Sequence, residues 1–265
     1  MQPARAAPSV LVQLSDLHLR AGENGAGPAR RLRQAVAAVA ELRPGPVAVL
    51  LSGDIADSPS DAAYELALEL LAPLGVPVHA IPGNHDDPAR LAARFPAGSV
   101  EGEPSRVVFS CGALRVVGLD STTPGSDAGA LAGEQLAWLE RVLSGEPDVP
   151  TLLSLHHPPV LSGIRSMDLI ALDAGDSSAL EDVIARHRQV LAVTCGHVHS
   201  SMVTSFAGRP LLICPSVNST VELDLRPRDD LPFAASVSPV GFLVHALIDG
   251  RLVSHFQPFE DPARG

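Results

Sequence analysis

The stretch Val47-Ala48-Val49-Leu50-Leu51-Ser52-Gly53-Asp54 is an apolar run that ends abruptly in small residues and a carboxylate. A short apolar run bounded by turn residues is typical of a buried strand. In an α/β fold, ligands gather at the carboxyl ends of the strands, so this strand would deliver Asp54 to the ligand site. The stretch therefore predicts an α/β protein whose functional site is built around Asp54.

Four other apolar runs end in polar side chains in the same way. Their ends read Asp16-Leu17-His18, Gly83-Asn84-His85-Asp86, His156-His157-Pro158-Pro159 and Gly196-His197-Val198-His199. Carboxylate, amide and imidazole groups are thus expected to converge where the strands end. This combination of groups indicates a metal site.

Helical periodicity separates the first three strands, over residues 30–42 and 61–74. The alternation of strand and helix in the first 85 residues implies right-handed crossovers and a sheet covered on its faces. The later sequence predicts helices at 88–95, 133–143 and 179–187, paired strands at 106–110 and 114–119, and hairpins over 202–214 and 242–256. Asp249-Gly250 is a type I′ turn signal within the last hairpin.

We expect residues 1–265 to form one domain, a two-sheet α/β sandwich flanked by helices. Residues 217–265 would be a C-terminal loop and hairpin extension, whose exposed edges could support a homodimer. The segments 157–176 and 217–239, which are predicted loops, are expected to select the substrate.

The composition limits the classes of partner. A formal charge of −11 disfavours a nucleic acid polymer across the surface, whereas a small anionic substrate held by bound cations remains compatible. Three cysteines without C-x-x-C spacing argue for reduced thiols, so we predict a cytoplasmic protein. No apolar run approaches the roughly 20 residues of a membrane span, and no signal peptide is recognised.

The donor groups suit two ions rather than one. The Asp16-x-His18 pair can aim both side chains at one ion, and a second ion about 3.5–4 Å away needs an anionic bridge. Asp54 is the natural bridge because its strand is central and carries no neighbouring histidine. The set is completed by a neutral oxygen and three imidazoles, from Asn84, His156, His197 and His199. Seven ligands with one shared predict a two-metal hydrolytic centre, with Mn or Fe as the first candidates and Zn as the alternative.

Taken in order, the motifs resemble the signature of the calcineurin-like metallophosphoesterases over residues 9–216. They are Asp16-x-His18, Gly53-Asp54-x-x-Asp57, Gly83-Asn84-His85-Asp86, His156-x-Pro158 and Gly196-His197-x-His199. Within that family, Leu14-Ser15-Asp16, Pro82-Gly83-Asn84-His85-Asp86 and His156-His157-Pro158-Pro159 are similar to the bacterial class III cyclic nucleotide phosphodiesterases and related glycerophosphodiesterases. The resemblance implies the αββα fold of this family.

The resemblance also implies a role for each site residue. One metal would take Asp16, His18, Asp54 and His199, and the other would take Asp54, Asn84, His156 and His197. A hydroxide between the two ions would attack the phosphorus of a small phosphodiester, first of all a 3′,5′-cyclic nucleotide. His85 would contact the phosphate and protonate the leaving group, with Asp86 orienting its ring.

Several alternatives remain open on the sequence alone. His157 could contact substrate or orient its loop, and Asp57 is expected to support a ligand rather than to be one. Other functions for the same scaffold are a glycerophosphodiester phosphodiesterase, a phosphomonoesterase or protein phosphatase, a nuclease, and a non-catalytic scaffold protein. The charge disfavours the nuclease, and the scaffold protein should show broken ligands, whereas all seven are present here.

Overall fold

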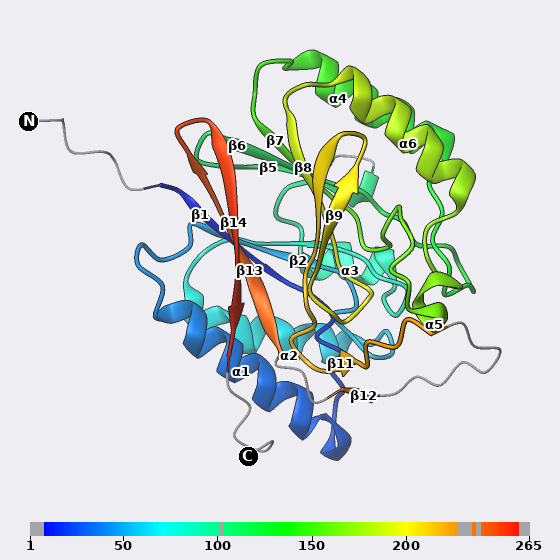
Figure 1. Cartoon of the computed structure of the whole chain (residues 1–265). Helices are drawn as coiled ribbons and strands as arrows, with labels where there is room; N and C mark the ends of the chain where they lie inside the picture. The colour runs from blue at the N-terminus through cyan, green and yellow to red at the C-terminus, as the bar shows by residue number, and fades with distance from the viewer. Residues whose placement is uncertain (1–7, 101–102, 227–234, 237–239, 260–265) are drawn as a thin grey trace, which may run out of the picture.

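A computed structural model describes residues 8–100, 103–226, 235–236 and 240–259. Two mixed sheets pack face to face, and helices cover the outer face of each sheet (Figure 1). The predicted two-sheet sandwich flanked by helices is confirmed. Residues 227–234 and 237–239 of the predicted loop over 217–239 lie outside the described residues.

The five-stranded sheet has the order β14-β13-β1-β2-β3. Strands β1 (Val10–Leu14), β2 (Ala48–Ser52) and β3 (Val78–Ile81) are parallel, and β13 (Gly241–Ile248) and β14 (Arg251–Pro258) add an antiparallel hairpin beside β1. Helices α1 (Ala26–Ala40) and α2 (Asp61–Leu71) pack on its outer face. Because side chains alternate along a strand, Val49 and Leu51 face these helices while Leu50 faces the other sheet.

The seven-stranded sheet has the order β4-β5-β6-β7-β8-β10-β9. Its parallel centre is β6 (Leu114–Gly118), β7 (Thr151–Ser154), β8 (Val190–Cys195) and β10 (Arg209–Ile213). Strands β4 (Ser99–Val100), β5 (Glu103–Cys111) and β9 (Met202–Phe206) are antiparallel to their neighbours. Helices α4 (Gly133–Gly145) and α6 (Ala174–Arg186) cover the outer face, where Trp138 is buried in the core.

The short elements lie at the ends and in the connections. They are the α-helices α3 (Pro88–Arg94) and α5 (Arg165–Asp168), the 3₁₀ helices η1 (Glu23–Gly25) and η2 (Ala72–Leu74), and the strand pair β11 (Thr220–Val221) and β12 (Ala235–Ser236).

Two helices begin earlier than the periodicity predicted. Helix α1 starts at Ala26, because Pro28 is tolerated in the first turn, where its missing N–H would have no partner inside the helix. Helix α6 starts at Ala174, where Asp173 accepts hydrogen bonds from the N–H groups of Gly175 and Asp176. The segment 157–176 is therefore not a bare loop, since it contains α5 and the first turn of α6.

The C-terminal hairpin is part of the main sheet rather than an appendage. Strand β13 pairs with β1 in the interior of the five-stranded sheet, and Phe242 is buried in the core beneath α1 and α2. Asp249 and Gly250 both have positive φ, 50° and 75°, which confirms the predicted type I′ turn.

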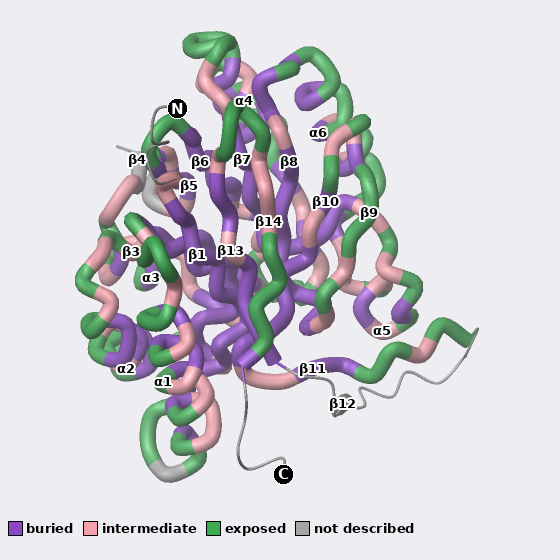
Figure 2. The backbone as a smooth tube through the Cα atoms, turned by 60° about the vertical axis from the view of Figure 1, so that its left-hand side comes forward, coloured by how far each residue is buried: buried purple, intermediate pink, exposed green. Residues whose placement is uncertain are grey.

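A buried polar network joins the two sheets below the carboxyl ends of the strands. Gln13 on β1 donates from Nε2 to Ser52 Oγ (2.8 Å), and its Oε1 accepts from Thr194 Oγ1 (2.6 Å) and from His245 Nε2 (3.0 Å). All four side chains are fully buried. Figure 2 shows that β1 and β8, which carry two of them, run as largely buried strands through the middle of the molecule. The network fixes β1, β2, β8 and β13 relative to one another where the site is assembled.

Within the described ranges, no helix combines the length and the apolar character needed to cross a bilayer.

Candidate metal centre

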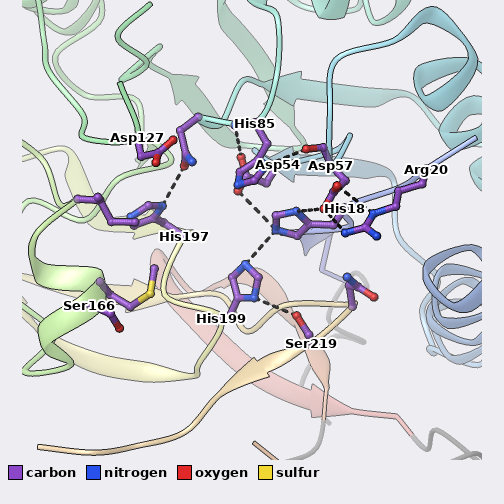
Figure 3. A pocket seen from close by; sticks show the side chains of 14 residues that line it. His18, Arg20, Asp54, Asp57, His85, Asp127, Ser166, His197, His199 and Ser219 are labelled. Atoms are coloured by element: carbon purple, nitrogen blue, oxygen red, sulfur yellow. Dashed lines mark hydrogen bonds and ion pairs between the residues drawn. The ribbon is translucent and has the colours of Figure 1, made fainter. Parts of the chain in front are cut away.

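Four of the five predicted strand ends meet at one edge of the sandwich, between the two sheets (Figure 3). The fifth joins them through His156, whose Nε2 lies 3.5 Å from Asp54 Oδ1. Six of the seven candidate ligands are buried, and Asn84 is half-buried. Ser52 and Cys195 mark the strand ends from which Asp54 and His197 extend. The alternating connections thus bring residues from 16 to 199 to one place, as the sequence predicted.

Backbone strain is concentrated at these positions. Among the described non-glycine residues, seven have a positive φ, and five of them are candidate ligands: Asp16 (54°), His18 (45°), Asp54 (53°), His197 (70°) and His199 (56°). The other two, Ala207 and Asp249, lie in hairpin turns. Because L-residues rarely adopt this conformation, its clustering at one site is typical of a functional centre.

Two glycines permit the close packing at this edge. Gly53 has φ 101°, and a Cβ there would collide with the His156 ring. A Cβ on Gly83 would collide with the Asp54 side chain and main chain. Glycine in Gly53-Asp54 and Gly83-Asn84 is therefore required by contact with the neighbouring site residues.

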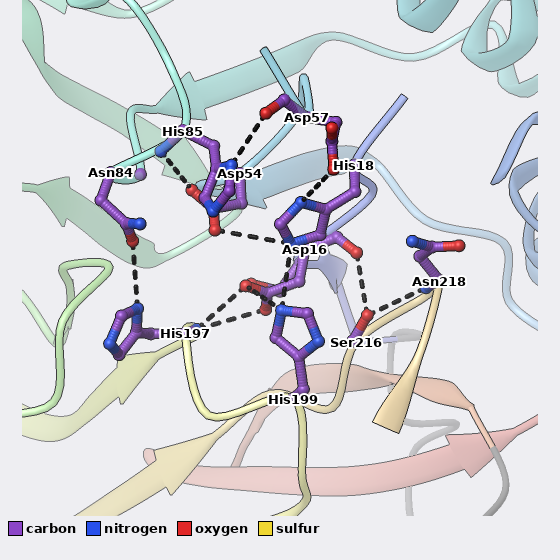
Figure 4. A network of polar contacts seen from close by, with 12 residues as sticks. Asp16, His18, Asp54, Asp57, Asn84, His85, His197, His199, Ser216 and Asn218 are labelled. Carbon is purple, nitrogen blue, oxygen red and sulfur yellow. Dashed lines mark hydrogen bonds and ion pairs between the residues drawn. The ribbon is translucent and has the colours of Figure 1, made fainter. Parts of the chain in front are cut away.

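The first cluster consists of Asp16, His18, Asp54 and His199, whose ligand atoms all lie within 4.8 Å of one another. His18 Nε2 lies 3.0 Å from His199 Nε2 and 3.5 Å from Asp54 Oδ2 (Figure 4). His199 Nε2 lies 3.5 Å from Asp16 Oδ1. Four donor atoms thus point at one small volume.

The second cluster lies on the other side of Asp54. His156 Nε2 is 3.5 Å from Asp54 Oδ1, and His197 Nδ1 is 3.1 Å from Asn84 Oδ1. His156 Nδ1 donates to the Ser52 carbonyl (2.8 Å), so Nε2 is the nitrogen that remains for an ion. Asp54 therefore turns one carboxylate oxygen to each cluster.

The residues fit two ions. Ligands about 2.0–2.2 Å from an ion lie roughly 3–3.5 Å from one another, which is the spacing of the donor atoms here. The Nε2 atom of His156, which faces the second cluster, is buried and has no hydrogen-bond partner within the described part of the chain. Burial also lowers the pKa of His18 and of His199 to about 4, which keeps both rings in the neutral form that binds metals.

Five of the seven candidate ligands line a cavity of about 360 Å³: His18, Asp54, Asn84, His197 and His199. Arg20, Asp57 and Ser219 lie beside the first cluster and make one end of the cavity polar (Figure 3), and Asn218 lies on the same side (Figure 4). Ser166 of helix α5 and Asp127 lie on the other side of the cavity (Figure 3). The lining also includes Met167 of α5 and Ile170, which follows that helix. The cavity can hold a small molecule across both clusters.

Residues 10–201 match the family model described as calcineurin-like phosphoesterase. The chain belongs to this family. The resemblance recognised from the five motifs is thereby confirmed.

Several bacterial proteins are similar in sequence to this calcineurin-like phosphoesterase. It is 35% identical over 223 residues to the probable glycerophosphodiester phosphodiesterase GpdQ of Arcobacter nitrofigilis, covering 82% of this chain and 81% of the relative. It is 39% identical over 208 residues to a probable cyclic nucleotide phosphodiesterase of Synechococcus, covering 78% and 79%. It is 35% identical over 212 residues to the 3′,5′-cyclic adenosine monophosphate phosphodiesterase CpdA of Escherichia coli K12, covering 78% and 75%.

The same fold occurs in solved structures of low sequence identity. A dimetal phosphatase from Danio rerio superposes with a TM-score of 0.71 at 20% identity, covering 95% of this chain and 97% of the other. This likeness supports the two-sheet architecture of the calcineurin-like phosphoesterases.

His85 lies at the cavity wall without belonging to either predicted ligand set. Its Nδ1 donates to the Asp57 carbonyl (2.8 Å), and its main-chain N–H donates to Asp54 Oδ1 (2.9 Å). Burial lowers its pKa, but the charge of Asp54 and the Asp57 carbonyl outweigh burial and raise the pKa above its ordinary value. The Nε2 of His85 can therefore hold a proton near neutral pH.

The expectation that Asp86 orients the His85 ring is wrong in this structure. The Asp86 carboxylate accepts from the N–H groups of Ile55 (3.1 Å), Ala56 (3.1 Å) and Gly83 (3.0 Å) and from Tyr64 OH (3.3 Å). An aspartate that immediately follows a histidine can face another way, because the turn redirects it. Asp86 instead holds the loops after β2 and β3 together.

The structure decides between the two roles left open for His157. Its Nε2 donates to the Asp127 carbonyl (3.1 Å), so Nδ1 accepts from Ser121 Oγ (2.8 Å). Burial lowers its pKa to about 3, and Gly129 packs against the ring. His157 groups with His156 and His197, but both of its nitrogens are engaged. Its role is to anchor the loop that carries Asp127.

Asp57 lies 3.5 Å from His18 Nδ1, where it can support a candidate ligand as the sequence predicted. Sequence reasoning missed other supporting residues. Arg20 contacts both carboxylate oxygens of Asp57 at 2.9 Å. Ser216 donates to the Asp16 carbonyl (2.8 Å), and Ser219 Oγ contacts His199 Nδ1 (3.2 Å). A sixth strand end could have indicated Ser216 and Ser219, because β10 is followed directly by Cys214-Pro215-Ser216.

Proposed function

We propose that this protein is a metal-dependent phosphodiesterase that hydrolyses a small phosphodiester, with a 3′,5′-cyclic nucleotide as the first candidate. The observation that carries the proposal is the geometry of Asp54, whose Oδ2 faces His18 and whose Oδ1 faces His156, each at 3.5 Å. A carboxylate with one oxygen directed at each of two imidazole clusters is suited to bridge two ions.

We assign Asp16, His18, Asp54 and His199 to one ion and Asp54, Asn84, His156 and His197 to the other. Two transition-metal ions would supply Lewis-acid activation of water and of the phosphoryl oxygens. Manganese and iron are the first candidates, with zinc as the alternative, because all three accept carboxylate and imidazole.

His85 is assigned as the general acid. Its Nδ1–H is committed to the Asp57 carbonyl, so the ring presents Nε2 as its other proton-carrying atom. A proton held there can pass to the alkoxide oxygen that leaves phosphorus, and such transfer contributes roughly 10²–10⁴ in rate. Asp57 thus positions His85 through its main chain rather than its carboxylate.

A diester is favoured over a monoester by the charge of the cavity. A monoester dianion carries a second negative charge that a free arginine or lysine would stabilise. Among the described residues that line the cavity, Arg20 is the one with a permanent positive charge, and Asp57 neutralises it through two short contacts. The net charge of −11 further disfavours a nucleic acid substrate.

The relatives suggest two substrate classes, cyclic nucleotides and glycerophosphodiesters. Met167 and Ile170 give one end of the cavity an apolar wall against which a nucleobase could pack. This wall favours the cyclic nucleotide, and a glycerophosphodiester remains the second candidate.

The test compares substrates on Mn²⁺-reconstituted protein. We would measure kcat/KM for 3′,5′-cyclic AMP, glycerophosphoethanolamine and bis(p-nitrophenyl) phosphate, with p-nitrophenyl phosphate as the monoester control and Asp54→Ala as the metal-site control. Preference for cyclic AMP supports the first candidate, and preference for the glycerol diester supports the second. Faster turnover of the monoester than of every diester would overturn the proposal.

We further propose a single cytoplasmic domain that can form a homodimer. Cys111, Cys195 and Cys214 are unpaired and buried, which suits a reducing compartment. The edges of β9 and β14 are available for pairing with a second copy. Light scattering of the purified chain tests for the dimer. A monomeric mass at micromolar concentration would exclude a dimer at that concentration.

A further inference from the structure

The loop after β10 carries a side chain into the cavity that neither the motifs nor the ligand sets include. Val217 N–H donates to the Ser15 carbonyl (3.0 Å), which places this loop beside the end of β1. Ser216 Oγ accepts from the N–H groups of Asn218 (2.9 Å) and Ser219 (3.0 Å) while donating to the Asp16 carbonyl. The backbone of Asn218 is therefore fixed relative to Asp16 and, through the contact of the neighbouring Ser219 with His199, to a second candidate ligand.

The orientation of the Asn218 amide follows from its partner. Arg31 on α1 donates from Nη1 to Asn218 Oδ1 (3.0 Å). A guanidinium carries only donors, so the amide end that faces it must be the oxygen. The NH₂ end is thereby turned away from Arg31, toward the side of His18, as Figure 4 shows.

The chemistry of this end of the cavity defines what Asn218 can bind. Ser219 lies beside the first cluster, across the cavity from Ser166 of α5 (Figure 3), and Asn218 lines the same cavity on the side of His18 and His199 (Figure 4). With its oxygen engaged by Arg31, the amide is a neutral donor, which suits an oxygen acceptor on the substrate. Sugar and glycerol substituents carry hydroxyl oxygens close to the ester bond, whereas a nitrophenyl substituent carries none there.

We propose that Asn218 recognises a hydroxyl oxygen of the sugar or glycerol substituent of the phosphodiester, and that Arg31 is the positioning residue for its amide. This inference rests on the proposed phosphodiesterase function. It makes the polar end of the cavity a polyol subsite, which the cyclic nucleotide and the glycerophosphodiester would share.

The kinetic test uses Asn218→Ala in the Mn²⁺-loaded enzyme, after metal content and Tm have been matched to those of the wild type. We expect kcat/KM to fall about 3- to 10-fold for 3′,5′-cyclic AMP or glycerophosphoethanolamine, as for the loss of one hydrogen bond. Turnover of bis(p-nitrophenyl) phosphate should be unchanged. An equal fall for all substrates, or no fall for any, would overturn the inference while leaving the phosphodiesterase function intact.

A binding measurement separates this inference from the catalytic proposal. By calorimetry, Asn218→Ala should weaken 5′-AMP or glycerol 3-phosphate about 3- to 10-fold and leave inorganic phosphate unchanged. The two organic phosphates distinguish a nucleoside from a glycerol occupant. If the wild type hydrolyses no diester, the phosphodiesterase proposal fails, and these affinities still decide the role of Asn218.

A double-mutant cycle tests Arg31. Arg31→Met should reproduce the selective loss seen in Asn218→Ala and should add nothing to it in the double variant, because Arg31 acts through the amide. Arg33→Ala, an exposed arginine on the same helix, is the matched control and should change neither kcat/KM nor affinity. If the losses of kcat/KM in Arg31→Met and Asn218→Ala were fully additive in the double variant, Arg31 would not act through Asn218, and its positioning role would be overturned.

Discussion

The His85 ring is held by the main chain of Asp57, through a hydrogen bond of 2.8 Å from Nδ1 to the carbonyl oxygen. The Asp57 carboxylate faces elsewhere, toward Arg20 and His18. Ring orientation is therefore a property of the loop after β2, and it does not depend on the protonation state of a neighbouring carboxylate.

His85→Ala should keep both metals and lose activity by about 10²–10⁴-fold, because it removes a proton donor and no ligand. Asp54→Ala should lose the metal pair, because both clusters share that carboxylate. Metal content by mass spectrometry and kcat on a diester would be measured for both variants. Equal metal loss in the two would contradict the role assigned to His85.

Asp86→Ala should destabilise the fold by about 3 kcal/mol, since three buried N–H groups lose a charged acceptor. Asp87→Ala is the neighbouring control and should cost about 1 kcal/mol, because it removes the cap of α3 and an exposed ion pair with Arg90. Urea unfolding measures both. A normal stability combined with a shifted pH–rate profile in Asp86→Ala would instead restore a role in orienting His85.

Gln13→Leu should destabilise the protein by about 2–4 kcal/mol, because Ser52, Thr194 and His245 would each lose a buried partner. Gln34→Leu on α1 is the matched control, since its Oε1 is buried without a partner among the described residues. The control should leave the free energy of unfolding within about 0.5 kcal/mol of the wild type. Similar losses in both would mean that the network between the sheets contributes little.

His245 should make stability depend on pH between about 6.5 and 4. Burial lowers its pKa in the folded state to about 4, so as the pH falls the unfolded chain takes up a proton first. Its contribution is complete above pH 6.5, and about 3 kcal/mol is lost by pH 4. His245→Gln should flatten this part of the wild-type profile, and the exposed His255→Gln on β14 supplies the control. An unchanged profile in His245→Gln would contradict the assigned pKa.

Removal of metal by a chelator should lower Tm, and added Mn²⁺ should restore it, because binding to the folded state alone stabilises it. At a free metal concentration 100 times Kd the gain is about 3 kcal/mol per site. Asp54→Ala should show little of this response. A response in Asp54→Ala as large as that of the wild type would place the ions elsewhere.

The sequence by itself determined the fold class and the candidate ligands. An apolar run that ends in Gly-Asp indicates both the fold class and a ligand. The apolar residues predict a buried strand, and the aspartate follows the carboxyl end of that strand, where the ends of neighbouring strands meet. The site residues from 16 to 199 could be named for this reason before their distances were known.

Only the tertiary structure decided which neighbours each of these side chains meets. Adjacent residues in a turn point in different directions, so Asp86 and His157 could not be assigned from their positions next to His85 and His156. The contact between Arg31 and Asn218 spans 187 positions and has no local signature. Local pattern thus specifies where strands end, whereas long-range packing specifies what each side chain at those ends touches.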